Sequence, residues 1–191
     1  RFCARMIADA LSGLHYTHEL RDYAGVPLEV VHRDISPHNL FVTYDGNVKV
    51  LDFGVAKTSA KLNETAVGVL KGKLSYMAPE QAAAHPIDRR ADLYSMGVVL
   101  WELLTLERLR TAESAAGVLN EALQGYLPEV SKVRPGVPRQ LENVLWQALA
   151  HYPHRRYRTS QEMRDALALY LTTEPCSSEE LAELMQSRFG Q

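Results

Sequence analysis

One short segment of the chain, VVHRDISPHNLFV at residues 30–42, gathers polar side chains that could do chemistry between two apolar flanks. Its polar members are His32, Arg33, Asp34, Ser36, His38 and Asn39. A carboxylate such as that of Asp34 can accept a proton from a hydroxyl group, and an amide oxygen such as that of Asn39 can bind a hard cation. Polar groups of this kind in a segment otherwise suited to burial indicate a reactive site.

The residues that follow this segment predict a β-hairpin. Two runs rich in β-forming residues, 40–43 and 48–51, flank an Asp-Gly pair that is typical of tight hairpin turns. Because antiparallel pairing brings the two ends of a hairpin together, we expect Asn39 and Asp52 to be neighbours in space.

Asn39 and Asp52 would together offer hard oxygen ligands. Such ligands suit Mg²⁺, which takes few protein ligands and completes its shell with water and phosphate oxygens. The pair therefore indicates a nucleotide site. Asp34 lies on the same loop as Asn39 and could accept the proton of a hydroxyl brought up to a metal-bound phosphate.

Composition excludes several classes of protein. The chain has 191 residues, 46% of them hydrophobic and 23% charged, which is the composition of an ordinary globular protein rather than a disordered one. Its formal net charge of −2 gives no broad field that would attract nucleic acid or anionic lipid, so neither is expected as a partner. Function must therefore depend on a local site.

The two cysteines and the apolar stretches bear on location. Cys3 and Cys176 lie at opposite ends of the sequence, which suits free thiols in a reducing compartment and predicts a cytoplasmic protein. The most apolar stretch begins at Met96, is too short for a bilayer and contains Glu102, so no membrane segment is expected in this chain.

No zinc site is expected, because the histidines outside the polar segment's HRD triplet have no ligand constellation. They are His15, His18, His38, His85, His151 and His154.

Hydrophobic periodicity predicts a mainly helical chain around the hairpin. An amphipathic helix begins at or before the first residue and runs to about His18, and residues 91–106 are apolar nearly all round, which predicts a buried central helix. Shorter helices are expected around residues 113–124, 139–150 and 160–171.

The order of motifs resembles that of the large C-terminal lobe of a serine/threonine protein kinase. HRD at 32–34 with Asn39 resembles the catalytic loop, DFG at 52–54 the metal-binding motif, and APE at 78–80 the end of the activation segment. The three motifs stand in the family's order, the resemblance covers nearly the whole chain, and SYMAPEQ at 75–81 suggests a bacterial member.

The resemblance implies an α+β, mainly α fold, that of a kinase C-lobe in which a short β-hairpin carries the catalytic and metal-binding loops. Residues 1–171 are expected to form this partial kinase domain, and residues 172–191 a C-terminal helical tail. Ser177 and Glu180 in the tail have capping-box spacing, which predicts a final helix, loosely attached.

Matched residue by residue, the resemblance also implies roles. Asp34 would be the catalytic base that orients the substrate hydroxyl, and Asn39 and Asp52 would bind Mg²⁺ with ATP. Phe41 would lie under the adenine ring, and Gly54 would complete the metal-binding motif.

Other matched residues would support the site. His32 and Phe53 would stack in a hydrophobic spine, and Asp92 would accept hydrogen bonds from the backbone of the catalytic loop. Alternatively, Asp92 is only a first-turn acid favoured by the helix dipole. Glu80 would pair with Arg156 and tie the activation segment to the helical subdomain, a pair that is costly to break from one side if it is buried.

Two positions depart from the family's usual pattern. Serine/threonine kinases usually carry Lys two residues after the catalytic Asp, where this chain has Ser36, and Thr after the Gly that opens the docking loop, where it has Lys73. We hypothesise an exchange, in which Lys73 supplies the ammonium near the phosphate and Ser36 takes over the hydrogen bond of the Thr. The alternative is that Lys73 only faces solvent and activity is weakened or lost.

Acceptor and control are also implied by the resemblance. Pro37 and Tyr76 fit serine/threonine kinases better than tyrosine kinases, so Ser and Thr side chains of proteins are the expected acceptors. Arg33 beside the catalytic Asp is typical of kinases in which phosphorylation orders the activation segment. Thr65 is the preferred site of that phosphorylation, ahead of Thr58 and Ser59.

The matched lobe is half of a kinase domain. The sequence contains no Gly-rich phosphate-covering loop and no VAIK-like lysine strand, so we expect the 191 residues alone to be inactive and to come from an active signalling kinase. Two alternatives are a pseudokinase that acts as a binding or scaffolding module, and a non-catalytic helical interaction domain.

Overall fold

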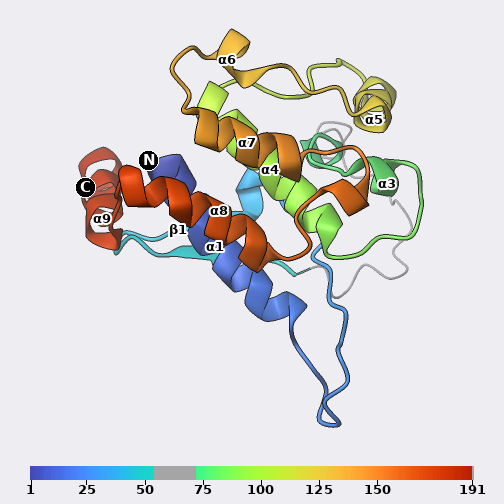
Figure 1. Cartoon of the computed structure of the whole chain (residues 1–191), viewed down its shortest axis with the longest axis horizontal. Coiled ribbons are helices and arrows are strands. Elements are labelled where there is room, and N and C mark those ends of the chain that lie inside the picture. The colour runs from blue at the N-terminus through green and yellow to red at the C-terminus, as the bar shows by residue number, and fades with distance from the viewer. Residues whose placement is uncertain (54–71, 191) are drawn as a thin grey trace.

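The computed structural model describes residues 1–53 and 72–190 of the chain. It is mainly helical with one two-stranded antiparallel sheet, which confirms the predicted fold class. In chain order the elements are α1 (Phe2–His18), η1 (Pro37–Asn39), β1 (Leu40–Val42), β2 (Val48–Val50), α3 (Pro79–Ala82), α4 (Arg90–Thr105), α5 (Ala115–Gln124), α6 (Val130–Val133), α7 (Arg139–Ala148), η2 (Pro153–Arg155), α8 (Ser160–Thr173) and α9 (Ser178–Phe189) (Figure 1).

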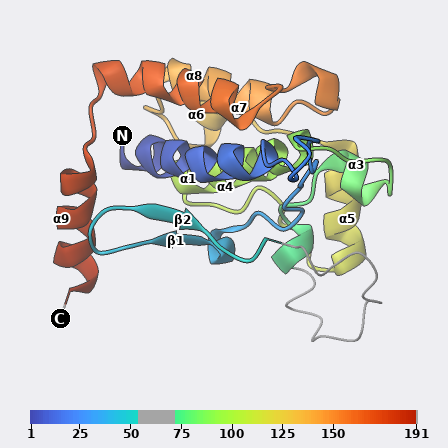
Figure 2. The ribbon, with the colours of Figure 1, turned by 90° about the horizontal axis from the view of Figure 1, so that it is seen from below.

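The centre of the fold is α4, whose residues are buried on every side through most of its length, as its composition predicts. Helix α1 packs its apolar stripe, which includes Ile7, Leu11 and Leu14, against α8 and α4. Figure 2 shows α8 on one side of α1 and the hairpin on the other. The hairpin thus lies on a helical layer, which positions its two ends beside the catalytic loop.

The hairpin forms in the predicted place with slightly shorter strands. Leu40 pairs with Val50 and Val42 with Val48. The turn closes through hydrogen bonds from Thr43 N to Asn47 O at 2.8 Å and from Gly46 N to Thr43 O at 3.1 Å. Gly46 has a φ of 77°, a left-handed conformation that suits glycine.

The C-terminal helix α9 forms with the predicted capping box, in which Ser177 Oγ accepts a hydrogen bond from Glu180 N. The helix is anchored at a few points: Leu181 is wholly buried and the helix backbone contacts the hairpin at Gly46, whereas its other side chains are partly or fully exposed. Only one of its apolar side chains, that of Leu181, is buried, so the apolar pattern of the helix did not reveal the anchor.

Among residues 1–53 and 72–190, no helix is long and apolar enough to cross a bilayer.

Candidate active site

The loop that carries Asp34 is held from below by one buried carboxylate. Asp92, in the first turn of α4, accepts hydrogen bonds from the backbone N–H groups of His32 and Arg33, both at 2.8 Å. The predicted contact is therefore present, and Asp92 does more than favour the helix dipole. Arg33 has a φ of 66°, a left-handed conformation that costs free energy, and the two bonds hold the backbone there.

Sequence reasoning missed the role of His18, which completes this anchor. Its Nε2 lies 2.8 Å from Asp92 Oδ2 and its Nδ1 lies 3.1 Å from the hydroxyl oxygen of Ser160. His18 and Asp92 are both buried, so the carboxylate has protein partners in place of water. In the sequence, His18 appears only as one more position in the apolar periodicity of α1, which does not reveal its partner Asp92.

His32 joins the loop to the hairpin. Its Nε2 donates to Leu51 O at 2.9 Å, and its Nδ1 accepts the N–H of Asp34 at 3.3 Å, an arrangement that requires the neutral Nε2–H tautomer. The ring is wholly buried and packs on Phe53 with 4.7 Å between ring centroids. The two rings are therefore in contact, as expected, but they are tilted by 59° rather than stacked.

The hairpin brings Asn39 and Asp52 together, as predicted. Leu51 N donates to Asn39 O at 2.8 Å, so Asn39 lies opposite the residue that precedes Asp52. The Asn39 side chain donates its Nδ2 hydrogen to Asp34 O at 2.7 Å. This bond fixes the amide so that its oxygen, the better metal ligand, is the end left for a cation.

Asp52 supplies the second oxygen group. Its backbone has a φ of 56°, and the residue is exposed at the end of the hairpin. An exposed carboxylate and an oriented amide oxygen, on residues that the hairpin brings together, fit Mg²⁺, which keeps several non-protein ligands. Asn39 and Asp52 are therefore the residues that would hold the metal.

Lys73 reaches the carboxylate of Asp34 from the other side of the site. Its Nζ lies 2.8 Å from Asp34 Oδ2, with the Lys73 side chain 49% exposed and that of Asp34 14% exposed. An ammonium at this distance places a positive charge at the proposed base. Lys73 therefore does not merely face solvent.

Ser36, two residues after Asp34, is buried. It is the residue before η1, in extended conformation, and its hydroxyl caps no backbone group of that turn. Among the residues that the structure describes, no hydrogen bond links Ser36 to Lys73, so the hydrogen-bonding half of the predicted exchange is not seen as a direct contact.

The docking loop, residues 72–77, is fixed by a cluster of hydrogen-bonded side chains that the sequence did not predict. Tyr76 donates its hydroxyl hydrogen to Glu102 at 2.8 Å, and Arg108 bonds both residues. Burial, together with the nearby Glu102 carboxylate, raises the pKa of Tyr76 well above its ordinary value. Arg110 donates to Leu74 O at 2.9 Å and to a second loop carbonyl.

The predicted ion pair of Glu80 and Arg156 is present and buried. Its two hydrogen bonds measure 2.6 and 2.7 Å, and the side chains are 9% and 0% exposed. The Arg156 guanidinium also donates to three backbone carbonyls, including Ala150 O at 2.8 Å, and lies 4.7 Å from the ring of Tyr94. This pair fixes α3 against the loop that precedes α8.

Some predicted site residues lie away from this group or beyond the described residues. Phe41 faces outward on β1 and is 54% exposed, which leaves its ring open to an adenine. Arg33 is exposed, as a phosphate ligand would be. Gly54 and Thr65 lie outside the described residues, as do the second-choice phosphorylation sites.

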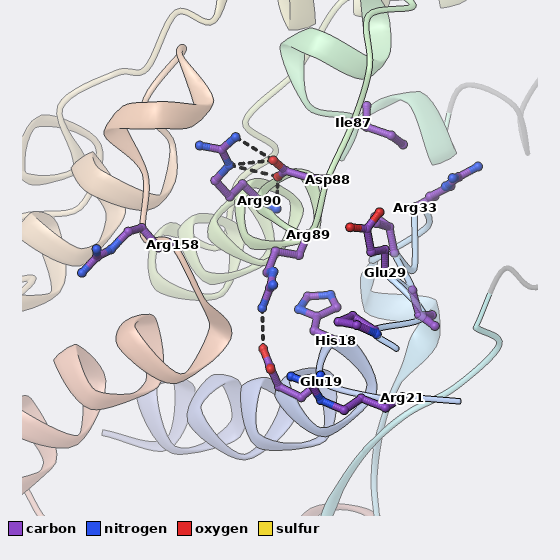
Figure 3. A pocket seen from close by; sticks show the side chains of 13 residues that line it. His18, Glu19, Arg21, Glu29, Arg33, Ile87, Asp88, Arg89, Arg90 and Arg158 are labelled. Carbon is purple, nitrogen blue, oxygen red and sulfur yellow. Dashed lines mark hydrogen bonds and ion pairs between the residues drawn. The ribbon is translucent and has the colours of Figure 1, made fainter. Parts of the chain in front are cut away.

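A cavity of about 570 Å³ lies beside the catalytic loop, between residues 19–31 and the start of α4. Its lining mixes arginines with carboxylates, among them the ion pairs Arg89 with Glu19 and Arg90 with Asp88. Figure 3 shows its arginine side chains pointing in different directions. None of Asp34, Asn39 and Asp52 lines it, although Arg33 of the catalytic loop does.

Comparison with known proteins agrees with the geometry. The sequence model described as "Protein kinase domain" matches residues 1–189. The chain is 50% identical over 168 residues to tyrosine-protein kinase MasK of Myxococcus xanthus, an alignment that covers 88% of this chain and 26% of MasK.

Two further relatives are named serine/threonine-protein kinases. PrkC of Bacillus subtilis is 37% identical over 135 residues, which cover 71% of this chain and 21% of PrkC. PknL of Mycobacterium tuberculosis is 37% identical over 150 residues, which cover 78% of this chain and 36% of PknL. The chain therefore spans well under half the length of these relatives.

Proposed function

Because the chain belongs to the protein kinase family, we propose that it forms the part of a kinase that transfers the γ-phosphoryl group of ATP to Ser and Thr hydroxyls of proteins. The observation that carries the proposal is the set of hydrogen bonds that joins Asp34, Asn39 and Leu51 at the open end of the hairpin, which we call its root. Asn39 is hydrogen-bonded to the backbone of Asp34 and lies across the hairpin from the residue before Asp52.

Each of these residues has a role in phosphoryl transfer. Asp34 orients the acceptor hydroxyl and accepts its proton, and Asn39 and Asp52 hold the cation. Mg²⁺, when bound, neutralises charge on the phosphate oxygens. Transfer of this type depends on position and charge more than on covalent chemistry by the protein. The buried support under the loop suits that requirement, because it fixes Asp34 and Asn39 before any substrate arrives.

The choice of Ser and Thr as acceptors is the finer part of the proposal. Pro37 and Tyr76 are its sequence support, and the names of PrkC and PknL agree with it, whereas MasK is named a tyrosine kinase. Three peptides that differ only in a central Ser, Thr or Tyr distinguish the classes. We expect phosphorylation of the Ser and Thr peptides; transfer to the Tyr peptide alone would reverse the assignment.

We further propose that Lys73 supplies the positive charge that the residue at position 36 does not. A lysine is a point charge on a flexible stem, so it can act from the docking loop as well as from the catalytic loop. The 2.8 Å contact to Asp34 supports this placement. Ser36 is buried and carries no charge, so it supplies none at this position.

The test is a set of variants of an active enzyme that remove the lysine charge from position 73 or move it to position 36. A chimera that joins the part of MasK preceding the matched segment to Arg1 supplies the nucleotide-clamping lobe. In it, Lys73→Ala should lower kcat about a hundredfold, the usual effect of removing one positioned charge. The double variant Ser36→Lys with Lys73→Thr, which restores the common family arrangement, should recover most of that loss. Lys73→Ala with unchanged kcat would reject the exchange.

Regulation by phosphorylation is proposed at Thr65, with Arg33 as the partner of the phosphate. The exposed position of Arg33 beside the loop supports it. Mass analysis of the active chimera should find phosphate at Thr65, and Thr65→Ala should lower activity. Active protein without phosphate between residues 52 and 80 would contradict the proposal.

A second candidate function, a pseudokinase that acts as a binding or scaffolding module, is favoured by Ser36 alone. Asp34→Asn in the chimera separates the two. If the unmutated chimera transfers phosphate and Asp34→Asn abolishes transfer while nucleotide binding is kept, the enzyme is supported. If the unmutated chimera already binds nucleotide without transferring phosphate, the pseudokinase is supported. The 191 residues by themselves are expected to be inactive in the same assay. We place the reaction in the cytoplasm, in line with the free thiols of Cys3 and Cys176.

A further inference from the structure

We propose that helix α9 is a positioning element of the active site, which holds the tip of the β1–β2 hairpin and thereby fixes the two metal ligands at its root. The inference rests on the proposed function only for the identity of Asn39 and Asp52 as those ligands. Figure 2 shows α9 standing across the tip of the hairpin.

The contact between α9 and the tip is close and involves backbone. A Cβ atom on Gly46 would lie 2.0 Å from Ser178 O and 3.0 Å from Ala182 N, so no side chain fits there. Tyr44, in the same turn, donates its hydroxyl hydrogen to Phe189 O at 3.0 Å, and its own carbonyl accepts a hydrogen bond from Gln186 at 3.3 Å. Contacts at both ends of α9 therefore hold the turn.

The other side of α9 is attached to the first turns of α1. Arg1 pairs with Glu180 at 2.9 Å, and Arg5 donates to Cys176 O, just before the helix, also at 2.9 Å. Leu181 is wholly buried beneath the helix. Helix α9 thus links the hairpin tip to α1, the helix on which the hairpin lies.

The hairpin needs this support, because it is short. Its strands have three residues each, and an isolated two-stranded hairpin is at best marginally stable in water. One face packs on α1, where Val50 lies next to Gly13, and the other leaves Phe41 exposed. Without α9 the turn would be free to pivot away from α1.

Movement of the hairpin would reach the metal ligands directly. Asn39 and Asp52 lie at its two ends, and the bond from Leu51 N to Asn39 O is the last between them. From the catalytic loop, His32 donates to the carbonyl oxygen of Leu51, in the peptide group that joins Leu51 to Asp52. Because Mg²⁺ demands near-ideal geometry, a small change in the separation of the two oxygen groups weakens its binding.

The first experiment uses the 191-residue chain and needs no catalysis. Gly46→Ala places a methyl group against α9, and Gly25→Ala is its matched control, since the two glycines have φ of 77° and 80° and nothing lies within 4 Å of the Cβ position at Gly25. Both variants therefore place alanine at nearly the same left-handed φ, and only Gly46→Ala disturbs the α9 contact. Leu181→Ala disturbs α9 from its other side.

Hydrogen exchange at the Leu51 amide measures how often the bond from Leu51 N to Asn39 O, at the root of the hairpin, opens. We expect Gly46→Ala and Leu181→Ala to raise that exchange rate at least tenfold, with the amides of α4 unchanged as a sign that the core is folded. Gly25→Ala should leave Leu51 unaffected. Faster exchange at the turn amide of Asn47 with no change at Leu51 would overturn the proposal, because α9 would then hold the tip alone.

A second measurement tests the consequence for the metal. In the MasK chimera, Gly46→Ala should raise the Mg²⁺ concentration for half-maximal activity severalfold and leave the KM for the peptide unchanged. A loss of kcat with no change in Mg²⁺ dependence would contradict a positioning role. If the chimera transfers no phosphate while Leu51 responds as expected, the proposed function fails and the coupling of α9 to the hairpin stands.

Discussion

The support beneath the catalytic loop and the contact above it are built in opposite ways. Below, Asp92 is buried and takes three hydrogen bonds, from His18 and from two backbone N–H groups. Above, Lys73 meets Asp34 through a pair whose lysine side chain is 49% exposed. Buried polar groups are costly to leave unpaired, whereas exposed pairs add little stability. The molecule therefore separates the groups that fix the loop from the charge that faces the reaction.

The largest stability effect is expected at the buried ion pair of Glu80 and Arg156. Arg156→Ala leaves a buried carboxylate uncompensated and removes three hydrogen bonds to carbonyls, so the free energy of unfolding should fall by about 3–5 kcal/mol. Arg158→Ala, two residues on, removes a pair in which the arginine is 83% exposed and should cost less than about 1 kcal/mol. Urea denaturation of the chain measures both. Equal losses would mean that burial does not set the contribution of these arginines.

Asp92 should give the next largest effect. Asp92→Ala leaves buried donors without an acceptor, so we expect a loss of about 3 kcal/mol in the free energy of unfolding. Asp88→Ala is the control, because Asp88 also lies at the start of α4 but pairs with Arg90 at the surface. If the helix dipole explained the contribution of Asp92, the two variants would lose similar amounts, below about 1 kcal/mol.

The stability of the chain at alkaline pH should depend on the buried residue Tyr157. Burial, with the nearby Glu162 carboxylate, raises the pKa of Tyr157 to about 12 from an ordinary 10.0. Between these values the folded chain keeps a proton that the unfolded chain loses, so stability falls as pH rises above 10. We expect Tyr157 to contribute about 2 kcal/mol of this loss by pH 12. Tyr76, whose pKa is also raised, contributes to the same loss, so Tyr157→Phe should reduce the loss without abolishing it, as measured by urea denaturation across this range. A variant that loses as much as the wild type would show that Tyr157 is not responsible.

The elements that sequence predicts best are those with strong local signals. The hairpin has its Asp-Gly turn, α4 its unbroken apolar composition, and the catalytic group its motif order, and each stands where the sequence places it. Contacts between distant segments were predicted only where the family resemblance named both partners, as for Asp92 and for Glu80 with Arg156.

Contacts without such a guide were missed for a physical reason. His18 looks like one more residue of an apolar stripe, Glu102 and Arg108 like surface charges, and Gly46 like an ordinary turn glycine. Their roles depend on segments far away in sequence, which no local pattern encodes. The attachment of α9 is the clearest example, since its single buried leucine gives almost no periodic signal.

Lys73 should show the smallest effect on stability. Lys73→Ala removes a pair in which the lysine is 49% and Asp34 14% exposed, so the free energy of unfolding should change by less than about 1 kcal/mol. The control Lys132→Ala, whose pair with Glu129 is exposed on both sides, should change it still less. The two lysines are then expected to differ mainly in catalysis, since only Lys73 contacts the proposed base. A large loss of stability in Lys73→Ala would mean that this lysine fixes the docking loop as Asp92 fixes the catalytic loop. The fall in kcat would then follow from loop disorder, and the two regions would not differ as described. A small loss of stability together with a large fall in kcat is the result that assigns the charge of Lys73 to the reaction itself.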